Sequence, residues 1–282
     1  MAGYQYISSG DTTQGQGYGN PVYDTKEDFD PSLTRLNTIK KLASYCDSLY
    51  SEQDNTSGIM YSSTYAEIAN NVIRKRFYHG YSYYGANKNF IASAISKVSV
   101  QGLSAIVIPD DILSYQYAAC SQQSIILMEL LKEKGIATRK VGFTGNITGH
   151  FTLEAYYDHN WHYFDPDKEP DEKVLAAYNY PSIAYLNSHP DVLLKAYPNH
   201  SKEYVMDVFT KYSYGAVSVF PAPKAIIFQK VAKFLSYTMW SFFLLAFIWV
   251  RRKYKRIGKP RLVKSQLRPF MIKRSIPEYS AA

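Results

Sequence analysis

Three side chains in the middle of the chain have the types and the order of a thiol-based catalytic site. Cys120 comes first, His150 lies thirty residues later, and Asp165 follows after fifteen more. A thiolate is a nucleophile, an imidazole can take up its proton, and a carboxylate can orient the imidazole. The sequence therefore predicts acyl-transfer chemistry at these residues, provided that the fold brings them together.

His150 and Asp165 are predicted to lie on one face of a β-hairpin. Polar and apolar residues alternate over 150–157, which is typical of a half-buried strand, and a short aromatic run follows. Residues 158–159 have the composition of a turn. A two-residue turn would pair Asp165 with Thr152 and place it diagonally across from His150, whereas an odd loop would separate the two residues.

Cys120 is predicted to begin a helix. Apolar residues recur at helical spacing from Ser121 onwards, and Lys134-Gly135 supplies an end signal. The free N–H groups and partial positive charge of a helix N-terminus lower the pKa of a thiol and can stabilise an oxyanion. The position of Cys120 therefore favours a reactive thiol.

The remaining chain is predicted to mix helices and strands. Residues 1–31 are polar and glycine-rich, which indicates a flexible leader before a domain at 32–223. A long helix is expected to begin at Pro31 with Ser32 as its N-cap. The other expected elements are helices at 63–78, 89–98, 174–186 (broken by a proline) and 192–197, and strands at 103–108, 136–142, 203–209 and 216–220.

The two cysteines and the charge distribution limit the function classes. Cys46 lies on an apolar helical stripe, so we expect it to be buried and inert. The formal net charge is +8, but residues 251–282 hold eleven Lys and Arg against one acid, which leaves −2 for the rest. The basic charge thus belongs to a tail. Such a tail suits an anionic membrane surface; a nucleic-acid partner is the weaker alternative and is not expected.

A membrane-spanning helix is predicted at 226–250. Residues 234–250 carry no charge, and seventeen helical residues span roughly 26 Å, close to the thickness of a hydrocarbon core. The basic residues that follow favour a cytoplasmic tail, 251–282, and an extracytoplasmic domain. The N-terminus shows no apolar signal segment, so either the true start lies upstream or the domain is cytoplasmic.

These residues together resemble the core of the transglutaminase-like superfamily. The resemblance is carried by Cys120 at a helix start, the Gly135-Ile136-Ala137-Thr138-Arg139 link, His150 opening a strand, Trp161, and Asp165-Pro166. It implies a papain-like α+β fold in which Cys120 attacks an amide carbonyl, His150 moves the proton and Asp165 orients the imidazole. It also implies a protein or peptide amide substrate, with Trp161 structural beside the site.

The sequence departs from the family pattern near the nucleophile. Two alanines precede Cys120 where glycine is frequent, and no tryptophan lies ahead of it to donate to an oxyanion. Gln116 is a candidate for that donor. His79 could reach the site, although nothing nearby requires it. The two histidines at 159 and 162 are poorly spaced for a metal, and no calcium-binding loop is evident, so no metal or cofactor is expected.

The combined prediction is an α+β, membrane-anchored thiol enzyme that hydrolyses or transfers an acyl group. The competing hypothesis is a catalytically inactive domain of the same fold that serves as a binding or assembly module. The sequence gives no indication of the oligomeric state or of the substrate beyond an amide.

Overall fold

The computed structural model describes residues 21–25, 27–53, 62–98, 103–146, 148–168 and 170–257. The chain divides into two compact units, Met1–Tyr237 and Thr238–Ala282. Most of the predicted leader, residues 1–20, and the end of the predicted tail, residues 258–282, lie outside the described residues.

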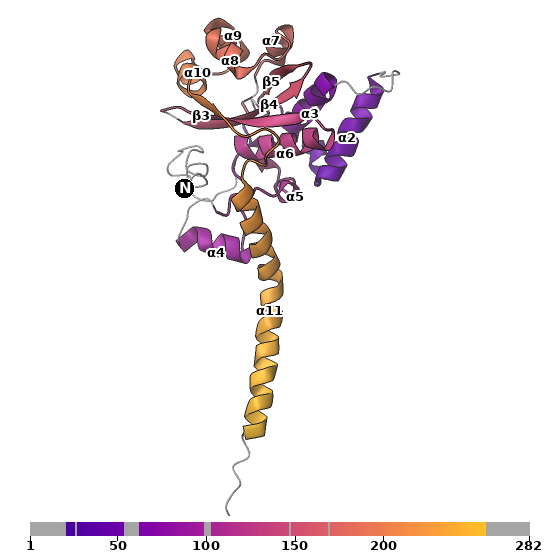
Figure 1. The fold of residues 1–282 in the computed structure, drawn as a ribbon, viewed down its shortest axis with the longest axis vertical. Helices are drawn as coiled ribbons and strands as arrows, with labels where there is room; N and C mark the ends of the chain where they lie inside the picture. Colours follow the sequence, from indigo (N-terminus) through magenta and orange to yellow (C-terminus); the bar gives the residue numbers. More distant parts are fainter. Residues whose placement is uncertain are drawn as a thin grey trace, which may run out of the picture. The chain divides into compact units, whose positions relative to one another are not determined.

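A four-stranded antiparallel sheet forms the centre of the first unit (Figure 1). Helices α3 and α6 contact β4, and α10 contacts both β3 and β4. Figure 1 shows α6 on one side of the sheet and α8, α9 and α10 on the other side. Both faces of β4 are therefore buried, and the prediction of a half-buried strand is wrong. The bounds, in sheet order, are β5 (Asn160–Phe164), β4 (Gly149–Tyr157), β3 (Ala137–Thr144) and β6 (Tyr212–Tyr214); the helices are α3 (Ser62–Arg76), α6 (Cys120–Glu133), α8 (Ile183–Ser188), α9 (Pro190–Ala196) and α10 (Lys202–Phe209).

The hairpin of β4 and β5 has the predicted register. Tyr157 pairs with Asn160, so that Asp158 and His159 alone form the turn. Both turn residues have positive φ, 46° and 62°, as a two-residue hairpin turn of type I′ requires. The same register, continued beyond the last strand pair, places Asp165 opposite Thr152.

The first helical region differs from the prediction at its start. Residues Pro31–Arg35 form a short 3₁₀ helix, η1, capped by the side chain of Asp30, so Ser32 is not the N-cap. The α-helix begins later, as α2 (Ile39–Glu52), with the Thr38 side chain accepting from Lys41 N–H. Leader residues also pack here: Asp30 N–H donates to the Lys75 carbonyl, and Phe29 contacts the Tyr78 ring.

Residues 103–108 do not form the predicted strand. Only an isolated bridge joins Ala105 to Tyr83. The buried side chain of Gln229 instead donates to the Leu103 and Ala105 carbonyls and accepts from Val107 N–H. This side chain satisfies three backbone groups of the segment, and Ile106 N–H and the Ser104 carbonyl are hydrogen-bonded to the backbone of Ser82 and Tyr84. The neighbouring elements are β1 (Tyr78–His79), which pairs in parallel with β2 (Tyr117–Ala118), α4 (Phe90–Val98) and α5 (Pro109–Ile112).

The segment after the hairpin is more helical than predicted. Residues 203–209 were expected to be a strand but belong to α10, which is capped by Ser201. The buried residues Val205, Val208 and Phe209 are spaced by three and four, which fits one face of a helix. The predicted strand at 216–220 is also wrong, because the strand that pairs with β3 is β6. The proline-broken helix is confirmed as α7 (Glu172–Ala177) and α8.

The last helix, α11 (Pro223–Ile257), begins in the first unit and continues into the second. Within the first unit, Gln229 is buried and Lys233 pairs with Asp111 at 2.6 Å. Beyond Tyr237, the large apolar side chains from Trp240 to Val250 are mostly exposed. Among the described residues, α11 is the one helix long and apolar enough to cross a membrane.

Candidate functional site

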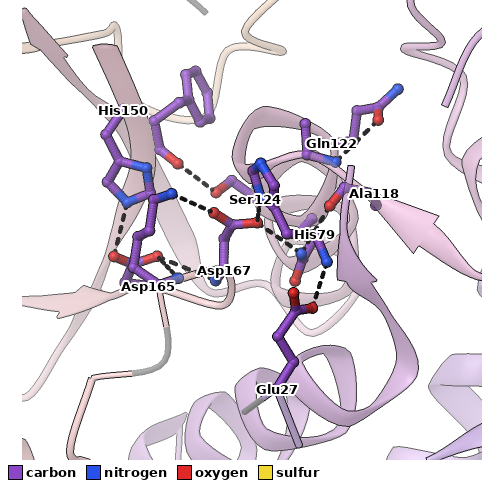
Figure 2. Close-up of polar contacts among 12 residues, drawn as sticks. Glu27, His79, Ala118, Gln122, Ser124, His150, Asp165 and Asp167 are labelled. Atoms are coloured by element: carbon purple, nitrogen blue, oxygen red, sulfur yellow. Dashed lines mark hydrogen bonds and ion pairs between the residues drawn. The ribbon is translucent and has the colours of Figure 1, made fainter. Parts of the chain in front are cut away.

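His150 and Asp165 form a buried hydrogen-bonded pair. His150 opens β4, Asp165 directly follows β5, and the hairpin register puts both on one face of the sheet. His150 Nε2 lies 2.8 Å from Asp165 Oδ2 (Figure 2). The exposed fractions are 3% for His150 and 0% for Asp165. The pair is therefore screened from water, which strengthens its electrostatic interaction.

Asp165 is held as a carboxylate by its neighbours. Its Oδ1 accepts the backbone N–H groups of Asp167 (3.1 Å) and Lys168 (3.2 Å), and its Oδ2 also accepts the hydroxyl of Tyr197 at 2.8 Å. Burial alone would raise the pKa of Asp165, but the charge of His150 and the hydrogen bonds from His150 and Tyr197 lower it below its ordinary value. The carboxylate is thus both charged and fixed in direction.

The His150 ring is positioned by aromatic packing as well as by Asp165. It stacks on Phe143, which pairs with it across β3 and β4, and it meets the edge of Phe209 from α10. Burial alone would lower the pKa of His150, but the charge and hydrogen bond of Asp165, together with the nearby Cys120, raise it above the ordinary value. These contacts leave Nδ1 as the ring nitrogen without a hydrogen bond.

Cys120 occupies the first position of α6, as predicted. Its thiol, a ring nitrogen of His150 and a carboxylate oxygen of Asp167 all lie within 4.8 Å of one another. Because Asp165 holds Nε2, Nδ1 is the nitrogen available to the thiol. The three residues singled out in the sequence are therefore brought together, with Cys120 only 6% exposed.

The start of α6 is held in place by Gln122. The Gln122 side chain accepts from Ala119 N–H at 3.1 Å and from Ser82 N–H at 2.9 Å, and it donates to the carbonyls of Ser82 and Ile106. Ala119 is the N-cap of α6 and Gln122 is the third helical residue, so the bond from Ala119 N–H to the Gln122 side chain is one of the two hydrogen bonds of a capping box. All four groups are buried, so this one amide connects the helix carrying the nucleophile to two distant segments.

Replacing Gln122 by leucine is expected to destabilise the domain and displace Cys120. The change leaves three buried groups unpaired, Ala119 N–H, Ser82 N–H and the Ile106 carbonyl, at about 1–3 kcal/mol each. We therefore expect a loss of at least about 3 kcal/mol and a Tm lowered by at least about 6 °C. Thermal unfolding of the detergent-solubilised protein measures the loss. Ser121→Ala, a neighbour on the same helix turn, is the control; an unchanged Tm in Gln122→Leu would contradict the prediction.

A second acidic residue, Asp167, joins the site from the loop after β5. Its Oδ1 lies 2.8 Å from His79 Nδ1 on β1 and accepts from Gln123 Nε2 at 2.9 Å (Figure 2). His79 is anchored in turn by its backbone N–H, which donates to Glu27. Sequence reasoning noted His79 but missed Asp167 and Gln123. Asp167 could have been found from its position in the sequence, because it lies only two residues beyond Asp165.

Two further residues predicted for the site, Gln116 and Trp161, lie outside the hydrogen-bonded group around His150, and so does His162, which was not predicted for it. Gln116 is exposed just before β2, and its carbonyl accepts from Tyr78 N–H. Trp161 pairs with Tyr156, six residues along β4 from His150, which is roughly 20 Å at strand spacing, and its ring packs on Arg139. His162 contacts backbone carbonyls and stacks on Tyr157.

Comparisons with known proteins find no match for this chain: no family model, no curated protein and no solved structure. What the structure supports is a mixed α+β fold with a grouping of Cys, His and Asp. Assignment to a superfamily therefore depends on the residues quoted above and on their geometry.

Proposed function

We propose that the protein is a transglutaminase-like thiol enzyme that forms an acyl-thioester on Cys120 from a protein or peptide amide. The observation that carries this proposal is the Cys120 thiol beside the free nitrogen of an imidazole whose other nitrogen is bonded to Asp165. The chain order of the elements supports it: a helix begins with the nucleophile, β4 begins with the histidine, and the aspartate ends the hairpin.

The proposed reaction needs only these groups. His150 Nδ1 takes the thiol proton, and the sulfur of Cys120 bonds to the amide carbonyl carbon. The oxyanion that forms is stabilised by the N–H groups of Cys120 and Ser121 at the start of α6, since those of Gln122 and Gln123 already donate to the Ala119 carbonyl. The imidazolium gives its proton to the leaving amine as the C–N bond breaks, and Asp165 stabilises the imidazolium meanwhile. Water then hydrolyses the thioester, or a second amine takes the acyl group.

A catalytically inactive binding module is the second candidate, and the burial of the site favours it. With Cys120 at 6% and His150 at 3% exposure, an amide must displace neighbouring groups to reach the sulfur. His79, whose side chain is about one-third exposed, lies at the accessible side of this cluster. A binding module of the same fold would use that surface without forming a covalent bond.

We further propose that α11 anchors the protein in a membrane as a single span. The uncharged stretch of the helix, 234–250, is followed within α11 by Arg251, Arg252 and Lys253. The positive-inside rule then puts this end in the cytoplasm and the catalytic unit outside it. Substrates would in that case be amides of extracytoplasmic proteins or peptides.

A peptide-based electrophile that mimics an amide tests the enzyme proposal. We expect one adduct per chain, mapped to Cys120 by mass spectrometry and absent in Cys120→Ser. Cys46 is an internal control, because it is fully buried and burial, with the charge of Asp47, raises its pKa to about 12. A thiol with so high a pKa is inert near neutral pH. An unlabelled Cys120, or equal labelling of both cysteines, would remove the enzyme proposal and leave the binding module.

A further inference from the structure

We propose that Cys120, His150 and Asp167 form a site for one thiophilic divalent cation, foremost Zn²⁺, whose binding blocks the nucleophile. The metal site itself stands apart from the proposed enzyme function. Only its consequence, inhibition, rests on that function.

The three ligand atoms are close enough to share an ion. Each lies within 4.8 Å of the other two, and the residues come from three separate elements: the start of α6, the start of β4 and the loop after β5. Zinc bonds of about 2.0–2.3 Å in a tetrahedral site require ligand atoms roughly 3.3–3.8 Å apart. Side-chain torsions of Cys120 and Asp167 can supply a contraction of about 1 Å.

Two buried atoms at this point are without hydrogen bonds. Neither His150 Nδ1, which lies beside the Cys120 thiol, nor Asp167 Oδ2 has a hydrogen bond, although His150 and Asp167 are 3% and 8% exposed. Buried polar atoms are nearly always satisfied, so each exception calls for a partner such as an ion. Lys168 Nζ lies 3.8 Å from Asp167 Oδ2, beyond hydrogen-bond distance, and is the cation that a metal would compete with.

The outer contacts match those of metal ligands. A metal-bound histidine usually donates its other N–H to a carboxylate, and His150 Nε2 does so to Asp165. The opposite oxygen of Asp167 is bonded to His79 and Gln123, which orients Oδ2. Such outer-shell partners typically contribute 10- to 100-fold to metal affinity.

The ligand set points to zinc and to reversible inhibition. One thiolate, one imidazole and one carboxylate suit Zn²⁺, with water in a fourth position. Binding releases the thiol proton to the buffer and changes no oxidation state. The sulfur lone pair and Nδ1 are then both engaged by the ion, so neither the nucleophile nor its base is available until a chelator removes the metal.

Metal titration of the tag-free, full-length protein in detergent tests the site. We expect Zn²⁺, competed against a chromophoric chelator, to bind one per chain, and Co²⁺ to give a thiolate-to-cobalt charge-transfer band. Cys120→Ser and Asp167→Asn should each weaken Zn²⁺ binding more than 100-fold, and Gln123→Leu by about 10- to 100-fold. Lys168→Gln should tighten it. Cys46→Ser and the exposed Asp191→Asn are matched controls that should bind as the parent does.

A second measurement avoids dependence on variants. Alkylating Cys120 before titration should abolish binding, and Zn²⁺ should slow alkylation of Cys120 in the parent until a chelator is added. Absence of the cobalt band, or undiminished zinc binding in Cys120→Ser or Asp167→Asn, overturns the metal site. If the amide mimic labels Cys120 but no metal binds, this inference alone fails; if metal binds but no acyl-thioester forms, the enzyme proposal alone fails.

Discussion

Replacing Asp165 by asparagine is expected to slow acylation of Cys120 by about 10³- to 10⁴-fold while leaving the domain folded. The effect follows from the backbone N–H groups of Asp167 and Lys168, which both donate to Oδ1. In the asparagine variant the side-chain oxygen must occupy this position, so its NH₂ group faces His150 Nε2. That nitrogen then becomes an acceptor and the ring proton moves to Nδ1, the atom that should receive the thiol proton. A wrong tautomer of this kind costs a catalytic triad about 10⁴ in rate.

The measurement is the rate constant for adduct formation with the amide-mimetic electrophile, followed by intact-protein mass spectrometry. Asp158→Asn, in the exposed hairpin turn, is the matched control and should react at the parent rate. Circular dichroism and Tm show whether the Asp165 variant has kept its fold. A rate within threefold of the parent would mean that Asp165 does not set the tautomer of His150, and the proposed role of the pair would be lost.

The hairpin could be predicted because the information is local. Alternation over 150–157 and two residues suited to positive φ determine a register, and that register places Asp165 against His150. The position of Cys120 was predictable for the same reason, since helix start signals involve only a few neighbouring residues.

The errors arise where distant segments decide the outcome. The alternation on β4 indicated one solvated face, but the short helices at 183–209 cover it, and sequence periodicity does not show a covering layer. Residues 103–108 have the composition of a strand, yet Gln229, more than 120 residues away, takes three of their backbone hydrogen bonds. The contact of Asp167 with His79 likewise joins residues 88 apart and depends on the parallel pairing of β1 with β2.

Placing arginine at both Leu244 and Phe247 is expected to prevent stable membrane integration of the 282-residue chain. In the proposed membrane span, the lipid-facing stretch of α11 can begin only after Lys233, which is paired with Asp111 in the first unit. It ends before Arg251, which leaves seventeen uncharged residues and roughly 26 Å, with no length to spare. An arginine at the centre of such a segment costs about 2.5–3.5 kcal/mol, and Leu244 lies two residues from that centre. Phe247 lies nearer the end and costs less, so the two together cost about 3–6 kcal/mol.

The free-energy cost of the two arginines is large enough to change membrane integration measurably. Because 1.4 kcal/mol is a tenfold change, the expected shift in the insertion equilibrium is on the order of 10²- to 10⁴-fold. The fraction of protein that resists alkaline carbonate extraction from membranes should fall from nearly all to a small part, whereas Leu244→Val with Phe247→Leu should behave as the parent does. If the double-arginine variant stays integrated, α11 is not the anchor. Its exposed apolar side chains would then need cover from protein, because an apolar surface of this extent is not left in water.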